Sequence, residues 1–415
     1  MTERFISRRR RKKSAAPALV VLGGGAVICF AVAFILFWTL GSRLAGGDGL
    51  GLSGLSRSGA KAQVAAPATA AAEPVKLPVG VDLQRFRDMA YVPVKGIYVS
   101  SWGAGSATLF PKMVDLADRT EINAMVIDIK DSTGYVSYDC SVSPVRQLKL
   151  WEWRIRKPAE MMATLNEHNI FPIARIVCFN DPLLATKKPE WAVMNKNGGI
   201  WKDNKGSSYI NPYNRQVWKY LVDLAEDAAD RGFREIQFDY VRFPSDGKIS
   251  ETSYPGEWGT MEDAIAGFLE YARGRLEKKG VWVSADVFGL TVYVKDDMGI
   301  GQRIEKIAPA VDIVCPMIYP SHYYAGAYGI NNPNSAPYDT VVYASKDASR
   351  RLEGTGCVYR PWLQDFSLSG VTYGVAEVKA QIKAVEEQGF SEWLLWDPSL
   401  KYTEGALRPD EGAGG

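Results

Sequence analysis

The sequence is poor in the residues that many enzymes use for nucleophilic or metal-dependent chemistry. Its 415 residues include only two histidines, His168 and His322, and five cysteines. The cysteines form no C-x-x-C pair and no Cys/His spacing typical of zinc sites, so we expect neither a structural metal ion nor a cofactor. With so little histidine, a Ser-His-Asp or Cys-His triad can be assembled in few ways. Carboxylates are therefore the better candidates for any chemistry.

The chain also lacks a strong excess of charge of either sign. Its formal net charge is +2, but seven basic residues lie within the first thirteen, so the remainder is slightly acidic. This composition does not favour a nucleic-acid-binding surface, and we expect no nucleic-acid partner. Hydrophobic residues make up 47% of the chain, which is enough for a large core.

One long uncharged apolar run lies near the N-terminus, at residues 17–40. A helix of this length spans a hydrocarbon core of ~30 Å, and the basic residues 1–16 place that end in the cytoplasm. The pattern predicts a single-pass anchor in the cell membrane, with the rest of the chain on the extracytoplasmic side. A cleaved signal peptide is the alternative, but the run is long for one and Arg43 interrupts the cleavage pattern. Residues 41–78 are typical of a flexible Gly/Ala/Pro-rich linker, and residues 403–415 of a flexible tail.

Between linker and tail, residues 79–402 alternate short β-type runs with longer helical patterns. The predicted strands are 96–101, 124–130, 171–179, 235–243, 281–288, 311–318, 358–364 and 393–396. The predicted helices are 109–120, 158–168, 215–231, 261–278, 300–307, 339–351 and 375–387. Because each parallel crossover needs a covering helix, eight such repeats predict a (β/α)8 TIM barrel. A doubly wound open sheet is the alternative, although no Gly-rich dinucleotide-binding turn follows the first strand.

Polar and aromatic residues gather where the predicted strands end, which is where TIM barrels carry their sites. The candidates, in chain order, are Trp102, Asp128, Lys130, Asp131, Trp201, Asp239, Arg242, Asp286, Tyr319, His322, Gln364, Asp365 and Trp396. Each has a plainer interpretation: the tryptophans could pack loops, Asp131 could begin a turn, and Lys130 and Arg242 could be counter-ions. Asp239 itself could be a structural salt-bridge acceptor for Arg242 or another cation. Their collective placement nevertheless indicates a site.

Several carboxylates in a ring of aromatic residues suit the cleavage of glycosidic bonds. One acid protonates the leaving oxygen, while a second attacks the anomeric carbon or activates water. The pair lies ~5–5.5 Å apart in retaining enzymes and ~6.5–9.5 Å apart in inverting ones. Asp239 and Asp286 are the best pair, because they end neighbouring predicted strands. We expect Asp239 to be the nucleophile or base, Asp286 to be the acid, and the other candidates to bind substrate.

Five motifs carry a family resemblance: F-D-Y-V-R-F-P, K-G-I-Y-V-S, D-I-K-D, M-I-Y-P-S-H-Y and L-W-D-P. Over residues 94–402 the chain resembles a bacterial "putative glycosyl hydrolase" family, which is defined as a domain of unknown function and placed among TIM-barrel glycosidases. The resemblance implies a barrel and a polysaccharide-type ligand. There is a looser similarity to amylase-like barrels, in which Asp239, Asp286 and Asp365 would match the nucleophile, the acid and a third carboxylate. That acid is a glutamate in the amylase-like barrels, and other barrels take it from the sixth strand, where this chain offers Tyr319 and His322.

The sequence therefore predicts a membrane-anchored glycoside hydrolase that acts on an envelope or extracellular polysaccharide. A catalytically inactive glycan-binding barrel that scaffolds an envelope complex is the alternative. A metal-dependent deacetylase is a third possibility, which the scarcity of histidine disfavours. Pairing of Cys140 with Cys178, or of Cys315 with Cys357, stays open at this point.

Overall fold

The computed structural model describes residues 91–410. The predicted basic tail, membrane anchor and linker lie outside the described residues, as does the end of the predicted C-terminal tail. Within residues 91–410, no helix is long and apolar enough to cross a membrane. The four cysteines of this part of the chain, Cys140, Cys178, Cys315 and Cys357, are buried and free.

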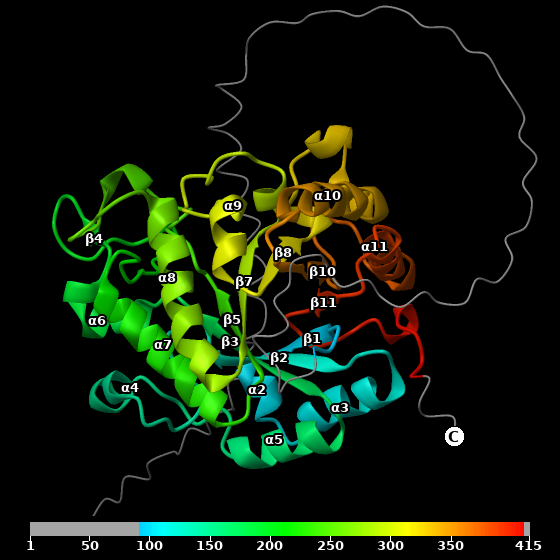
Figure 1. The fold of residues 1–415 in the computed structure, drawn as a ribbon, viewed down its shortest axis with the longest axis horizontal. Coiled ribbons are helices and arrows are strands. Elements are labelled where there is room, and N and C mark those ends of the chain that lie inside the picture. The colour runs from blue at the N-terminus through cyan, green and yellow to red at the C-terminus, as the bar shows by residue number, and fades with distance from the viewer. Residues whose placement is uncertain (1–90, 411–415) are drawn as a thin grey trace, which may run out of the picture.

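Parallel strands close into a barrel at the centre of the molecule (Figure 1). The strands are β1 (Lys95–Val99), β2 (Ala124–Lys130), β3 (Phe171–Val177), β5 (Glu235–Asp239), β7 (Trp282–Phe288), β8 (Ile313–Ile318), β9 (Val358–Tyr359), β10 (Trp362–Gln364) and β11 (Trp393–Trp396). Their order is β10-β11-β1-β2-β3-β5-β7-β8-β9, and β10 also pairs with β8, which closes the ring. The predicted TIM barrel is confirmed, and the open doubly wound sheet is wrong.

The seventh predicted strand is interrupted rather than continuous. It is divided into β9 and β10 by Arg360 and Pro361, and proline has no backbone N–H to donate to a ladder. Both pieces pair with β8, so together they form one of eight positions around the barrel.

Helices surround the barrel on its outside (Figure 1). They are α2 (Ser101–Ala104), α3 (Phe110–Arg119), α4 (Ser143–Leu148), α5 (Pro158–Glu167), α6 (Pro182–Lys187), α7 (Arg215–Asp230), α8 (Met261–Leu276), α9 (Ile304–Ile307), α10 (Pro337–Leu352) and α11 (Val375–Glu387). Beyond the strands, the short β4 (Met194–Asn195) and β6 (Thr252–Ser253) form a separate antiparallel ribbon. All seven predicted helices are present, although the predicted 300–307 shortens to α9.

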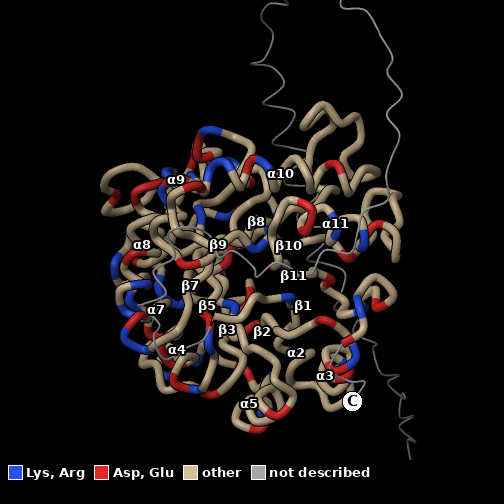
Figure 2. The backbone as a smooth tube through the Cα atoms, turned by 45° about the vertical axis from the view of Figure 1, so that its right-hand side comes forward, with Lys and Arg blue, Asp and Glu red and all other residues tan. Residues whose placement is uncertain are grey.

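The period of two along β5 separates the barrel interior from the helical layer. Phe238 packs outward against Phe268 of α8, with ring centroids 5.2 Å apart. Inside the barrel, Glu235 and Gln237 make polar contacts with Arg360 and Cys315, and Asp239 ends the strand. Figure 2 shows charged residues of both signs over the outer helices and loops, whereas the charged side chains of Glu235 and Asp239 are buried. Each such charge needs a partner or a function.

Candidate active site

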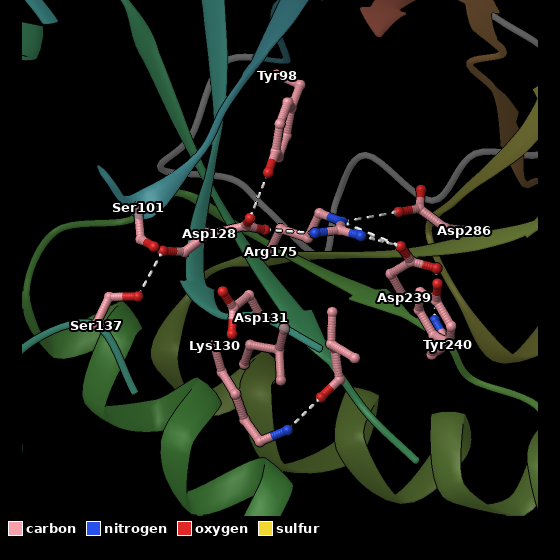
Figure 3. Close-up of polar contacts among 12 residues, drawn as sticks. Tyr98, Ser101, Asp128, Lys130, Asp131, Ser137, Arg175, Asp239, Tyr240 and Asp286 are labelled. Atoms are coloured by element: carbon pink, nitrogen blue, oxygen red, sulfur yellow. Dashed lines mark hydrogen bonds and ion pairs between the residues drawn. The ribbon is translucent and has the colours of Figure 1, made fainter. Parts of the chain in front are cut away.

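Arg175 of β3 is the centre of a cluster of buried charges at the carboxyl ends of the strands (Figure 3). Its Nε donates to Oδ2 of Asp239 at 3.1 Å, and its Nη2 contacts the same oxygen. Its Nη1 contacts Asp128 of β2, and Oδ2 of Asp286 lies 3.9 Å from Nε. One guanidinium therefore faces three carboxylates from strands β2, β5 and β7. These four side chains are at most 7% exposed, so water screens their charges only weakly.

An aromatic wall covers one side of this cluster. The rings of Tyr98 and Trp396 stack with centroids 4.0 Å apart, and the Tyr98 hydroxyl donates to Oδ2 of Asp128 at 2.6 Å. The Arg175 guanidinium lies 5.2 Å from the Trp396 ring centroid and 5.6 Å from that of Tyr98. These contacts fix the guanidinium plane in addition to the ion pairs.

Asp239 and Asp286 are neighbours that have different partners. Phe238 pairs with Ala285 across β5 and β7, so the two aspartates follow side by side. Oδ2 of Asp239 lies 3.1 Å from Nε of Arg175, and Oδ2 of Asp286 lies 3.9 Å from the same nitrogen. These two oxygens are therefore at most about 7 Å apart. This upper limit allows the ~5–5.5 Å spacing of retaining glycosidases and only the short end of the ~6.5–9.5 Å spacing of inverting ones.

The surroundings of Asp286 favour its protonated form. Burial and the negative charge of Asp239 raise its pKa well above the usual range, although Arg175 and a hydrogen bond oppose this. That hydrogen bond comes from Nε1 of Trp362, which donates to Oδ1 at 2.7 Å. Asp239, in contrast, accepts charge-assisted hydrogen bonds from Arg175. The two acids are thus held differently, as an acid and a base would need to be.

Two adjoining cavities lie at this rim, and the smaller one opens onto the cluster. The smaller, of about 40 Å³, is lined by Asp239, Asp286, Arg175, Trp362 and Trp396, among others. The larger, of about 260 Å³, has both polar and apolar walls, which include Tyr240, Arg242 and Phe288. Met317, Tyr319 and His322 line both cavities. The aspartate pair therefore lies beside a space of larger volume.

The chain turns sharply directly after Asp239. Tyr240 has a φ of 49°, in the left-handed region that bulky residues seldom adopt. This conformation ends β5 at Asp239, so the predicted continuation of the strand to residue 243 is wrong. It also places Tyr240 and Arg242 in the wall of the larger cavity. Strained residues of this kind collect at functional sites.

Six of the predicted site residues line one or both cavities: Asp239, Arg242, Asp286, Tyr319, His322 and Trp396. Asp128 joins them through Arg175, although it lines neither cavity. Burial lowers the pKa of His322 to about 4, so its ring is neutral near pH 7. Burial raises the pKa of Tyr319 well above its usual range, so this residue keeps its hydroxyl proton.

Lys130 and Asp131 take up other positions. The register of β2 against β3 shifts between Asp128 and Lys130. This irregularity breaks the alternation of side chains that would have put Asp128 and Lys130 on one face of the strand. The Lys130 ammonium is instead fully buried, 3.0 Å from Asp181 and 2.7 Å from the Val177 carbonyl. Asp131 pairs with Arg154 and accepts a hydrogen bond from the backbone N–H of Thr133.

The remaining predicted residues also lie outside the two cavities. Trp201 is 1% exposed, and its indole N–H donates to the Lys248 carbonyl at 3.1 Å, so it packs a loop. Trp102 is exposed on α2. Gln364 is buried and accepts from the backbone N–H of Ser321. Asp365 accepts two hydrogen bonds from Thr403, and burial raises its pKa to about 6.

Arg175 is the main member of the cluster that could not be foreseen from the candidate residues of the sequence. Of the cations that could pair with Asp239, Arg242 or another one, the structure shows another one, Arg175. The signal was an arginine within the apolar strand F-P-I-A-R-I-V, since arginine is seldom buried without a partner. Within residues 91–410, no three His, Cys, Asp or Glu side chains are grouped so that they could bind a metal ion.

Residues 96–402 match a protein family described as "Putative glycosyl hydrolase domain". No match was found among curated proteins. Among solved structures, a hypothetical protein from Ruminiclostridium thermocellum is 40% identical, with 49% of this chain and 98% of that one covered and a TM-score of 0.43.

Two more distant structures share the fold. The PgaB (BpsB) glycoside hydrolase domain from Bordetella bronchiseptica is 10% identical, with 76% and 99% of the chains covered and a TM-score of 0.54. The GH20 exo-β-N-acetylglucosaminidase from Vibrio harveyi, in an inactive variant, is 9% identical, with 78% and 55% covered and a TM-score of 0.50. At these identities the likeness concerns the barrel alone.

Proposed function

Because the chain belongs to the family of "Putative glycosyl hydrolase" domains, we propose that it is a glycoside hydrolase that cleaves an envelope or extracellular polysaccharide through Asp239 and Asp286. The observation that carries the proposal is the pair itself. Two buried carboxylates lie side by side at a cavity, and only one of them is within hydrogen-bond distance of the guanidinium.

In this mechanism Asp286 is the general acid. Its raised pKa keeps a proton available, and that proton passes to the glycosidic oxygen as the C1–O bond breaks. Trp362 holds one oxygen of Asp286 through its indole N–H, which leaves the other to carry the proton.

Asp239 either attacks the anomeric carbon or accepts a proton from the attacking water. Arg175 is a positioning residue for Asp239, because it orients the carboxylate before substrate arrives. Positive charge that develops on the sugar ring would be stabilised by the negative charge of Asp239 in the wall of the smaller cavity.

We also propose that residues 17–40 anchor the protein in the cell membrane, with the barrel on the extracytoplasmic side. The uncharged length of this segment and the basic residues before it support the proposal. A protease added to intact cells should degrade the barrel but leave a membrane-bound N-terminal fragment. Protection of the barrel in intact cells would contradict this orientation.

A catalytically inactive glycan-binding barrel is the second candidate. It is favoured by the ion pair between Arg175 and Asp239, which engages that carboxylate and could lock it in place. Both candidates bind glycan, so binding alone does not separate them.

Release of new reducing ends from a panel of envelope and exported polysaccharides tests the proposal. The full-length chain should release product from at least one of them. Asp365→Asn is the matched control for Asp239→Asn. Asp365 is a buried acid of the same rim, but it accepts a hydrogen bond from Thr403 and lines neither cavity. We expect this variant to retain activity. A folded chain that binds a polysaccharide without product release would favour the inactive barrel.

A further inference from the structure

Arg242 differs from every other buried arginine among residues 91–410. Four arginines are buried there: Arg154, Arg175, Arg242 and Arg360. Arg154 pairs with Asp131 and Glu152, Arg175 with the aspartate cluster, and Arg360 with Glu235 and Glu392. Within the described residues, Arg242 forms no ion pair with a carboxylate. A buried charge without a counter-ion is costly, so its retention calls for an explanation.

The guanidinium of Arg242 is held rigidly. It lies between two aromatic rings, 4.9 Å from the centroid of Tyr240 and 4.8 Å from that of Phe288. Its Nη1 donates to the Phe243 carbonyl and to the Ser245 hydroxyl, each at 3.0 Å. The Tyr209 hydroxyl is a further hydrogen-bond partner. These contacts are with neutral groups, so they orient the cation without neutralising it.

The same arginine lines the larger cavity, the space next to the aspartate pair. A ligand in that cavity could therefore provide the missing negative charge. A planar guanidinium between flat rings matches the planar fork of a carboxylate, with which arginine forms two parallel hydrogen bonds.

Two carboxylates in the cavity wall limit how much negative charge a ligand can carry. Oδ1 of Asp203 accepts from the backbone N–H groups of Lys205 and Ser207, and Oδ1 of Asp246 from that of Gly247. Both acids line the cavity together with Arg242. Lys205 also lines the cavity and offsets one of these two negative charges. The repulsion that is left favours a ligand with one negative charge over a doubly charged phosphate.

We propose that the larger cavity binds a sugar unit that carries a carboxylate, such as a hexuronate, and that Arg242 pairs with this carboxylate. The class of substrate is then an acidic polysaccharide. The statement that this sugar belongs to a substrate rests on the proposed function, but the carboxylate site itself does not require hydrolysis.

Binding of three monosaccharides to the full-length chain, measured by calorimetry or ligand-observed NMR, tests the proposal. Glucuronate should bind on the order of tenfold or more tightly than glucose, as expected for a charge-assisted pair. It should also bind more tightly than glucose 6-phosphate. Equal binding of glucuronate and glucose, or no glucuronate binding at millimolar concentrations, would overturn the proposal. Tighter binding of glucose 6-phosphate would overturn the choice of a carboxylate.

Variants then attribute the preference. In Arg242→Gln, checked for folding by circular dichroism, the preference for glucuronate over glucose should disappear. If that variant does not fold, Arg242→Lys should weaken the preference, because lysine keeps the charge but loses the fork. Persistence of the full preference in the folded variant would refute the role of Arg242. Asp239→Asn should keep the preference even without turnover, so a failure of the hydrolase proposal is distinguishable from a failure of this one.

Discussion

Replacement of Arg175 by glutamine should destabilise the fold strongly at neutral pH. The change removes the cation that faces Asp128, Asp239 and Asp286, and these carboxylates are at most 5% exposed. Removal of one partner from a buried ion pair costs about 3–5 kcal/mol, because the remaining charge stays buried and uncompensated. Glutamine can replace one or two of the lost hydrogen bonds but none of the charge. We therefore expect a loss in unfolding free energy within that range.

The loss should depend on pH in a defined direction. Without Arg175, the folded-state pKa values of Asp286 and Asp128 rise further above their unfolded values. Groups with raised carboxyl pKa values destabilise the fold when ionised, and protonation relieves this as the pH falls. The pKa values of Asp286 and Asp128 are already raised by burial in the intact cluster. The difference between the variant and the wild type should thus be smaller at pH 5 than at pH 7.

Urea unfolding followed by circular dichroism at both pH values measures the two differences. Arg275→Gln is the control, because Arg275 pairs with Glu226 near the surface, where its side chain is 31% exposed. A pair of this kind contributes at most about 1 kcal/mol. An Arg175→Gln loss no larger than that of the control, or one that does not shrink at pH 5, would refute our account of the cluster.

Three further substitutions test the roles of Trp362, Gly289 and Trp201 separately. Trp362→Phe removes the hydrogen-bond donor 2.7 Å from Oδ1 of Asp286, and its loss raises the pKa of that acid. The alkaline limb of the pH–rate profile should therefore move to higher pH. An unmoved limb would contradict the assignment of Asp286 as the acid. Gly289→Ala puts a Cβ 2.3 Å from the Met317 carbonyl oxygen, so it should lower the unfolding free energy by about 1–3 kcal/mol. Because both residues line the larger cavity, the substitution should also raise KM for the polysaccharide. Unfolding and steady-state kinetics measure the two effects. Trp201→Ala should lower the unfolding free energy by about 3–5 kcal/mol, as a thermal melt would show, because the Trp201 side chain is buried. The variant that still folds should keep its affinity for glycan. A selective loss of affinity would instead support the predicted role of Trp201 in binding.

The barrel could be predicted from the sequence because its signals are local. Each strand is a short apolar run, and helix ends are marked by residues such as Asn169, Gly232, Gly280 and Gly389, all of which have positive φ. The placement of Asp239 and Asp286 follows from the same pattern, since neighbouring strands end at one rim. The strands, the helix ends and the rim can be predicted from the hydrophobic period of the sequence and from the residues that end each element.

The partners of the site residues could not be predicted, because they depend on side-chain direction across strands. The register shift in β2 turns Lys130 away from Asp128, and the left-handed Tyr240 sends Arg242 into the larger cavity. Neither irregularity has a clear mark in the sequence. Arg175 did have one, but its contacts with three strands depend on closure of the barrel.

The most direct test of the central claim is the turnover of Asp239→Asn on whichever polysaccharide the full-length wild type cleaves, measured together with its affinity for that polysaccharide. The substitution keeps the size of the side chain and removes the nucleophile or base. We expect turnover to fall by a factor on the order of 10³ or more, with a dissociation constant within a few fold of the wild-type value. Turnover close to that of the wild type in the folded variant would contradict the assignment of Asp239 and, with it, the mechanism built on the aspartate pair.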